Sequence, residues 1–155
     1  MNRNIWMALA LAGAALGPAA CGDQAAPPPA GPEAPDGIAV SNGRLMLPAV
    51  AGNPAAVYFE VANTGSQNRV IRAASVAGAG STMMHVTTGT DMQEALQVMV
   101  TAGETAKFEP GAQHLMANDL ADTVVAGGKA EVTLTFVGGD KVSFPADVRA
   151  AGDDR

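Results

Sequence analysis

Both histidines of the chain and five of its eight methionines lie between residues 81 and 120. Imidazole nitrogen and thioether sulfur can each coordinate a metal ion. Only Leu115 separates His114 from Met116. On a β-strand these two side chains would therefore point to the same side, about 6.5 Å apart along the backbone. An imidazole and a thioether placed in this way can converge on one ion.

The candidate metal-binding side chains of this segment are His85, Met92, His114 and Met116. Thioether sulfur is a soft, neutral ligand that suits Cu(I) and has little affinity for zinc, magnesium or calcium, whereas imidazole accepts copper in both oxidation states. A site of two histidines and two methionines would therefore select copper, mainly Cu(I). Methionine cannot be lost to a disulfide in an oxidising compartment, and it binds weakly enough for the metal to be passed on.

The same residues also have a purely structural interpretation. Methionine commonly fills gaps in cores, and an isolated histidine is often a surface residue or a satisfied polar group. Met99 in "ALQVMV" and Met46 in "RLMLP" are expected in the core. Met83 and Met84 are adjacent, so a strand would turn them to opposite faces. If the strand is regular, Met83 is the one that shares the face of His85.

Other chemistries find little support. Cys21 is the single cysteine and lies near the N-terminus, far from the His/Met segment, and no serine stands in a G-x-S-x-G elbow. The sequence contains no phosphate-binding glycine loop, and its acidic residues are scattered. A net charge of -6 disfavours the basic surface that binding to nucleic acid requires. We expect neither an enzyme nor a nucleic-acid-binding protein.

The N-terminal residues predict export. Residues 1–20 begin with one arginine and continue as a short apolar run rich in alanine and glycine, as an export signal does. The sequence "GPAACGD" resembles a bacterial lipobox in which Cys21 would carry the lipid, although Pro18 stands where leucine is usual. The alternative is ordinary cleavage near Ala15–Gly17 or Ala20, which would release a soluble, secreted protein. Both routes place the domain outside the cytoplasm, and the lipid on Cys21 would be its only membrane attachment.

The rest of the chain predicts one all-β domain. Residues 21–36 are rich in proline and alanine and form a tether, residues 37–150 form the domain, and residues 151–155 form a short tail. In "AVYFEVANTG", Val57, Phe59 and Val61 fall on one face of a strand, opposite Tyr58, Glu60 and Ala62. The sequence "AEVTLTFVGGDKVSFPADV" predicts a hairpin at "GGD". Many short strands at such spacing indicate a sandwich or barrel.

The His/Met segment resembles the PCu(A)C family of periplasmic copper chaperones. The motif of that family is a histidine, a methionine after a gap of about ten residues, and a later His-x-Met pair. Here 21 residues separate Met92 from His114, as in that family, and Met116 completes the pair. "GNPAAVYFEVANTGSQNRVIRAASV", "TAGETAKFEPGAQHLM" and "AEVTLTFVGGDKVSF" are similar to its other conserved stretches. The chain departs from the motif between His85 and Met92, where only six residues intervene.

The resemblance implies a cupredoxin-like Greek-key β-sandwich that binds one Cu(I) ion through His85, Met92, His114 and Met116. Because the hairpin with "TTGTD" is short, Met83 or Met84 could supply or replace a ligand. The family delivers copper by ligand exchange to the dinuclear CuA centre of cytochrome c oxidase, often with a thioredoxin-like assembly protein.

Three alternatives stay open at this point. The protein could store copper or confer copper tolerance outside the cytoplasm. It could transfer electrons, but blue copper sites need a cysteine thiolate, and Cys21 lies beyond the tether. It could also be a structural or interaction β-sandwich without a metal, in which the His/Met cluster only packs.

Overall fold

The computed structural model describes residues 34–153, and within this range it contains ten strands and no helix. No helix long and apolar enough to cross a membrane occurs in the described range. The all-β prediction is confirmed. The strands are β1 (Ile38–Met46), β2 (Ala55–Asn63), β3 (Arg69–Val76), β4 (Ala79–Thr88), β5 (Asp91–Glu94), β6 (Val98–Val100), β7 (Thr105–Phe108), β8 (Gln113–Leu120), β9 (Lys129–Phe136) and β10 (Lys141–Arg149).

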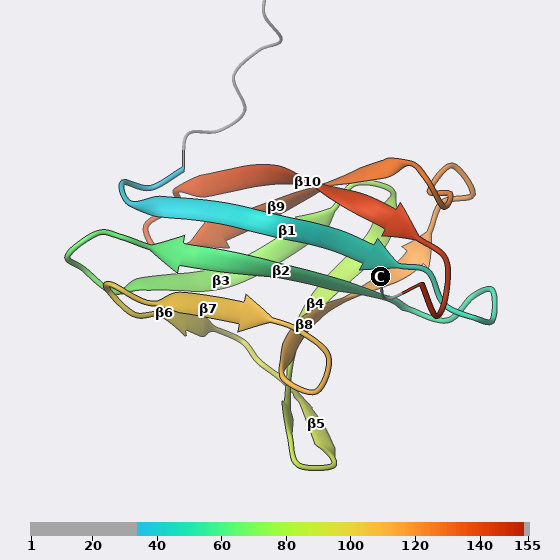
Figure 1. Ribbon diagram of the computed structural model, residues 1–155, viewed down its shortest axis with the longest axis horizontal. Coiled ribbons are helices and arrows are strands. Elements are labelled where there is room, and N and C mark those ends of the chain that lie inside the picture. Colours follow the sequence, from blue (N-terminus) through green and yellow to red (C-terminus); the bar gives the residue numbers. More distant parts are fainter. Residues whose placement is uncertain (1–33, 154–155) are drawn as a thin grey trace, which may run out of the picture.

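Hydrogen bonds join all the strands in the order β5-β4-β8-β7-β2-β1-β10-β9-β3-β6, and β8 also pairs with β2. Most neighbours are antiparallel, but β1 runs parallel to β10 and β7 runs parallel to β8. The sheet curls over on itself, so that β1 and β2 lie in front of β3 and β4, while β4 and β5 extend below the body as an arm (Figure 1). Strands that are distant in sequence, such as β2 and β8, thereby become neighbours.

The core lies between the two layers and follows from strand alternation. In β2, Val57, Phe59 and Val61 are buried, whereas Tyr58 and Glu60 between them are only half-buried, as the sequence predicts. Phe59 stacks on Phe108 with ring centroids 4.2 Å apart. Burying a side chain of this size contributes about 1.5–3 kcal/mol. The period-two pattern therefore stabilises the sandwich and decides which side chains of β2 face outward.

The predicted hairpin at "GGD" joins β9 to β10. Gly138 and Gly139 have φ of 106° and 101°, a conformation that other L-residues rarely adopt. The amide of Phe136 donates a hydrogen bond to the carbonyl of Asp140 over 2.8 Å and closes the turn. This part of the prediction is confirmed.

The two methionines expected in the core have different outcomes. Met46 is buried, as predicted. The prediction for Met99 is wrong, because its side chain is 58% exposed. Val98 and Val100 occupy the core side of β6, so strand alternation turns Met99 outward. There the side-chain amide of Asn68 contacts the Met99 sulfur.

The predicted export signal, residues 21–33 of the tether and the lipidation site Cys21 lie outside the described residues. Within the expected 37–150 domain, the strands run from Ile38 to Arg149.

Candidate metal centre

Two cross-strand pairs between β4 and β8 bring four candidate donors together. Met83 lies opposite Met116, and His85 lies opposite His114. Residues directly opposite each other in an antiparallel pair share a face, with Cβ atoms about 4.5–5.5 Å apart. Residues two apart on a strand also share a face. All four side chains therefore project from the same side of the sheet.

The two imidazoles are in edge-to-face contact. Their ring centroids lie 5.8 Å apart, and the ring planes are inclined by 84°. His114 is buried, whereas His85 is half-buried. The Nδ1 atom of His114 lies 3.2 Å from the carbonyl oxygen of Ala112, which a protonated Nδ1 satisfies by donating a hydrogen bond. Its Nε2 atom then carries a lone pair, the arrangement usual for a metal-binding histidine.

His85 supports the same interpretation through an unsatisfied atom. Its Nδ1 is buried and has no hydrogen-bond partner in the described part of the chain. Leaving such an atom without a partner costs about 1–3 kcal/mol, so each instance in a folded protein calls for an explanation. Gln113 Oε1, next to His114 in the sequence, is the other side-chain atom of this kind among the described residues. A soft cation beside the two imidazoles would satisfy the nitrogen.

Tyr58 of β2 borders the histidine pair, and the sequence did not single it out. Its ring lies 6.3 Å from that of His114 at an angle of 53°. The guanidinium carbon of Arg44 in turn lies 5.1 Å from the centre of the Tyr58 ring. The predicted alternation of β2 placed Tyr58 on the face opposite Val57 and Phe59, but only the pairing of β2 with β8 puts that face beside His114.

Met92 lies on the arm formed by β4 and β5. The register pairs Thr87 with Met92 and His85 with Glu94, and Gly89 in the connecting turn has a φ of 64°. Met92 therefore shares the face of His85 but is level with Thr87, nearer to the tip of the arm. Its side chain is 55% exposed. The short hairpin brings Met92 to the correct side of the sheet but not directly opposite His85.

The alternation of β4 separates the adjacent methionines. Met84 is buried and packs in the core, opposite Leu115. It faces away from the histidines, so we exclude Met84 from the candidate ligands. Met83 is 42% exposed and shares the face of His85, in line with the regular-strand expectation.

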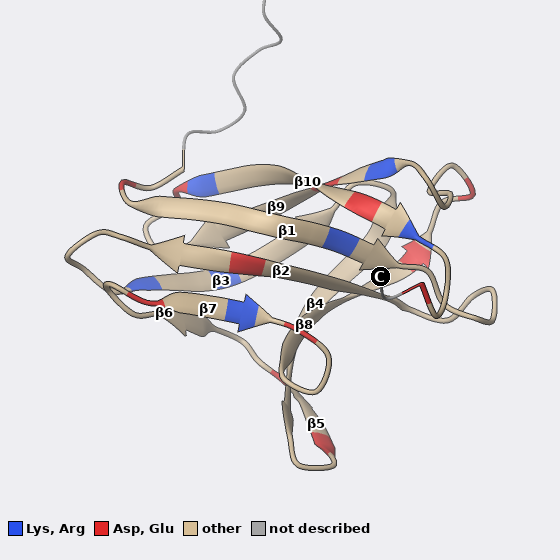
Figure 2. Ribbon diagram, in the orientation of Figure 1, with Lys and Arg blue, Asp and Glu red and all other residues tan. Residues whose placement is uncertain are grey.

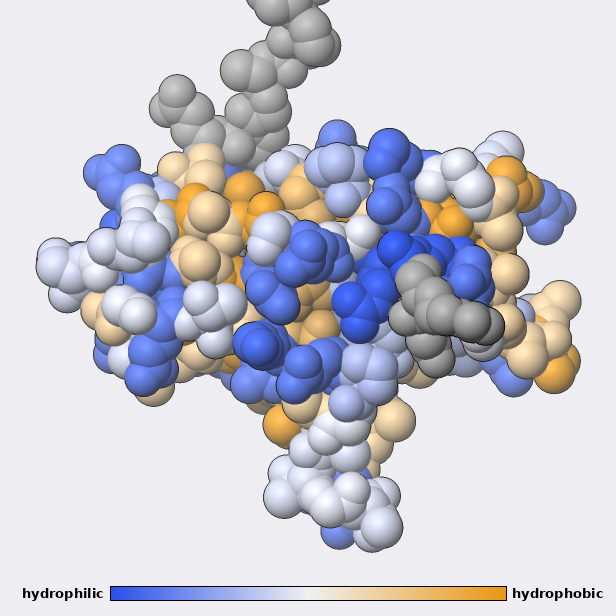
Figure 3. All heavy atoms as spheres, viewed as in Figure 1, coloured by the Kyte–Doolittle hydropathy of each residue, from blue (hydrophilic) through white to orange (hydrophobic). Residues whose placement is uncertain are grey.

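The described residues offer no competing site for a hard cation. No group of three or more His, Cys, Asp or Glu side chains in residues 34–153 is arranged to hold a metal ion. Positive and negative residues are interspersed over the face of the sandwich seen in Figure 2. Figure 3 shows the arm covered mainly by residues of intermediate hydropathy.

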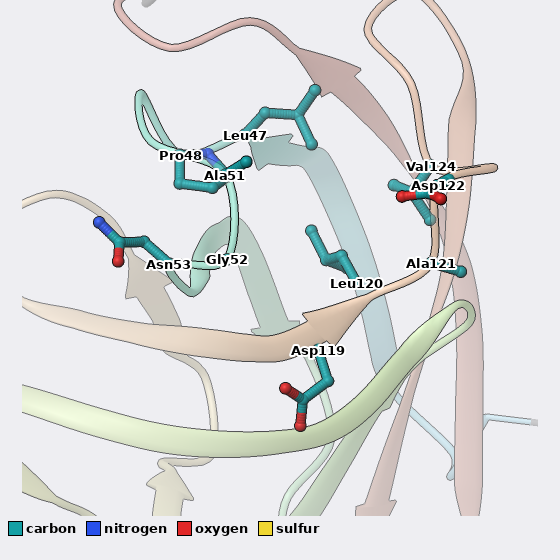
Figure 4. A pocket seen from close by; sticks show the side chains of 10 residues that line it. All are labelled: Leu47, Pro48, Ala51, Gly52, Asn53, Asp119, Leu120, Ala121, Asp122 and Val124. Atoms are coloured by element: carbon teal, nitrogen blue, oxygen red, sulfur yellow. The ribbon is translucent and has the colours of Figure 1, made fainter.

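A hollow of about 370 Å³ lies at the other end of β8, where Asp119 and Leu120 help to line it, and its lining includes neither histidine nor methionine. In Figure 4 the carboxylates of Asp119 and Asp122 do not point toward one another, and Leu120 lies between them. This hollow therefore lacks the convergent donors that the β4–β8 face provides.

Comparisons with known proteins agree with this architecture. A family model described as "Putative lipoprotein LpqE-like" matches residues 38–148. The curated "Putative lipoprotein Lxx21020" of Leifsonia xyli subsp. xyli (strain CTCB07) is 31% identical over 109 residues, which are 67% of this chain. The match spans 64% of the length of that relative.

Two solved structures show the fold. The copper-bound PCuAC domain from PmoF2 has a TM-score of 0.65 and 21% identity, over 78% of this chain and 99% of that one. The solution structure of CuI-DR1885 from Deinococcus radiodurans has a TM-score of 0.64 and 20% identity, over 79% and 85% of the two chains. The predicted cupredoxin-like sandwich is thereby confirmed.

Proposed function

The chain belongs to the LpqE-like lipoprotein family, and from this premise we propose that it is a copper chaperone that binds one Cu(I) ion outside the cytoplasm. The observation that carries the proposal is the pairing of His85 with His114 beside Met116 on one face of β4 and β8. Two neutral imidazoles and a thioether form a donor set suited to Cu(I). The copper-bound state of the PmoF2 domain and the CuI-DR1885 structure support this choice of metal.

In this proposal the ligands are His85, His114 and Met116, and a second methionine on the same face supplies a further thioether. The thioethers are neutral and exchangeable, so a partner's thiolates can replace them one position at a time, and the copper then moves to the stronger soft ligands. No covalent bond of a substrate is made or broken, so the protein acts as a carrier and not as an enzyme.

The recipient and the cellular location are part of the same proposal. The resemblance to PCu(A)C proteins supports delivery to the CuA centre of cytochrome c oxidase, with a thioredoxin-like protein as assembly partner. The family to which the chain belongs supports a lipid anchor at Cys21, which would hold the domain at the outer side of the cytoplasmic membrane.

An anaerobic competition titration tests copper binding. The purified full chain is titrated into a coloured Cu(I) complex of a chelator under reducing conditions, and the loss of colour reports transfer of copper to the protein. We expect withdrawal of one equivalent. If the protein withdraws no copper from the chelator over the range of affinities that the titration can measure, the proposal is contradicted. A packing role for the His/Met cluster would then be favoured.

Transfer is tested in a second step. The loaded chain is mixed with the soluble CuA-bearing domain of an oxidase, whose copper content is then measured. Copper that binds tightly but does not move to this domain would favour storage over delivery.

A further inference from the structure

We propose that Met83, and not Met92, is the thioether that completes the resting copper site with Met116, His85 and His114. This inference rests on the proposed function and changes only which methionine supplies the second sulfur. It follows from the register of three strands.

Met83 occupies a corner of a compact rectangle of donors. It lies directly opposite Met116 and two residues from His85, which itself lies opposite His114. The spacing across paired strands is about 5 Å between Cβ atoms, and the spacing along a strand is about 6.5 Å between alternate residues. An ion above the middle of this rectangle is within reach of all four side chains.

Met92 is too distant from Met116 to bind the same ion in this register. It is level with Thr87, four residues along β4 from Met83, and β4 lies between β5 and β8. These offsets place the Cα atoms of Met92 and Met116 about 16 Å apart. Each sulfur is three bonds of about 1.5 Å from its Cα, and metal–sulfur bonds are about 2.3 Å long, so two methionines on one ion span at most about 14 Å.

The identity of the residue opposite His85 points in the same direction. A second sulfur donor from β5 would be best placed directly across from this histidine, but Glu94 occupies that position. Met92 lies one pair nearer to the turn, on the arm that extends away from the body of the sandwich (Figure 1). The short hairpin thus places no sulfur of β5 directly opposite His85. Met83 can supply the second sulfur from β4 instead.

The positions of the two methionines predict separate roles. Met83 lies on the donor face two residues from His85, whereas Met92 is level with Thr87, nearer to the tip of the arm. Met83 would then determine how tightly copper is held, and Met92 would contact the ion only while it enters or leaves. The two roles can be distinguished by experiment. Loss of the Met83 sulfur would change the Cu(I) affinity, whereas loss of the Met92 sulfur would change the rate of copper transfer.

Four variants of the full chain test this assignment: Met83→Leu, Met92→Leu, Met116→Leu and the control Met99→Leu. Leucine keeps the volume and removes the sulfur. Met99 is as exposed as Met92 but lies on β6, at the other end of the strand order. Cu(I) affinity is measured by chelator competition, and the sulfur neighbours of copper are counted by X-ray absorption.

Met83→Leu and Met116→Leu should each weaken Cu(I) binding at least about tenfold, since even residues that only support ligands change metal affinity about 10- to 100-fold. In both variants the sulfur neighbours should fall from two to one. Met92→Leu and Met99→Leu should keep the affinity within about threefold and retain both sulfurs. Met92→Leu alone should slow copper transfer.

The opposite pattern would overturn the assignment. If Met92→Leu loses a sulfur neighbour while Met83→Leu retains both, the arm supplies the ligand. If the wild-type chain takes no copper at all, the proposed function itself fails, which is a distinguishable result. Far-UV circular dichroism and thermal unfolding verify that each variant is folded, and Met83→Ala must give the same loss of sulfur as Met83→Leu.

Discussion

His85 and His114 lie opposite each other on β4 and β8, with their ring centroids 5.8 Å apart and their ring planes inclined by 84°. One strand pairing brings them together across 28 intervening residues. In the described part of the chain, the two rings are not hydrogen-bonded to each other. The Nδ1 atom of His85 is buried there without a hydrogen-bond partner. A shared Cu(I) ion, as proposed above, would give that nitrogen a partner.

Replacing His114 by leucine should separate metal binding from stability. Leucine fills the buried position but has no nitrogen, so Cu(I) affinity should fall at least about tenfold. The lost hydrogen bond to Ala112 should change the free energy of unfolding by only about 0.5–1.5 kcal/mol. Chelator competition and urea unfolding measure the two quantities. Unchanged affinity in a folded His114→Leu protein would remove this residue from the site.

The contact with Ala112 predicts which nitrogen of His114 binds copper. Because Nδ1 donates its proton in a hydrogen bond to the Ala112 carbonyl, Nε2 keeps its lone pair and is the nitrogen that can bind copper. Nitrogen-15 NMR of the labelled chain should show a change in the chemical shift of Nε2 on addition of Cu(I), while Nδ1 retains its proton. A copper-dependent loss of the Nδ1 proton would reverse the assignment.

Asn63 should stabilise the fold without affecting copper. Its buried side-chain amide donates to the carbonyls of Gln67 and Val100 over 2.9 and 3.0 Å, and its oxygen accepts from the Gly65 amide over 3.1 Å. Asn63→Ala leaves these backbone groups unsatisfied and should cost about 2–3 kcal/mol in urea unfolding.

Asn68→Ala provides the matched control for Asn63, because the hydrogen bonds of Asn68 are exposed. The control should cost less than about 1 kcal/mol. Both variants should keep the Cu(I) affinity of the wild type. A loss of copper from folded Asn63→Ala would show that the end of β2 is coupled to the metal site.

The ion pair between Lys129 and Asp147 should affect stability only above acidic pH. The Lys129 ammonium donates a hydrogen bond to Asp147 and holds the pKa of this carboxyl below its ordinary value of 3.8. The contribution is therefore present above pH 3.8 and is lost as the pH falls through the lower, folded-state pKa. The pair is exposed, so its effect is small.

Urea unfolding of Asp147→Asn as a function of pH measures the contribution of this ion pair. The variant should be slightly less stable than the wild type at neutral pH, and the difference should vanish in strong acid. A difference that grows as the pH falls would contradict the assigned direction.

Cys21 provides a test of anchoring. If it carries the lipid, the exported wild-type chain should fractionate with membranes and incorporate labelled fatty acid, and Cys21→Ser should do neither. Ser41→Ala, a change within β1, serves as the control and should fractionate like the wild type. Equal recovery of wild type and Cys21→Ser in the soluble fraction would instead support ordinary signal cleavage.

Local alternation accounts for what the sequence alone determined. Alternation with a period of two residues is a property of neighbouring side chains, so the two faces of β2 and the face shared by Met83 and His85 followed directly from residue order. The hairpin at Gly138 and Gly139 was equally local. Donor chemistry also needs no coordinates, because thioether and imidazole favour copper wherever they meet.

Only the tertiary structure decided which residues meet. Met99 was misassigned because alternation gives the period of a strand but not its phase when the strand has three residues. Tyr58 became part of the site through the pairing of β2 with β8. The register of β4 with β5 placed Glu94, and not Met92, opposite His85. Register depends on contacts between segments distant in sequence, so residue spacing identified the donors but not their arrangement.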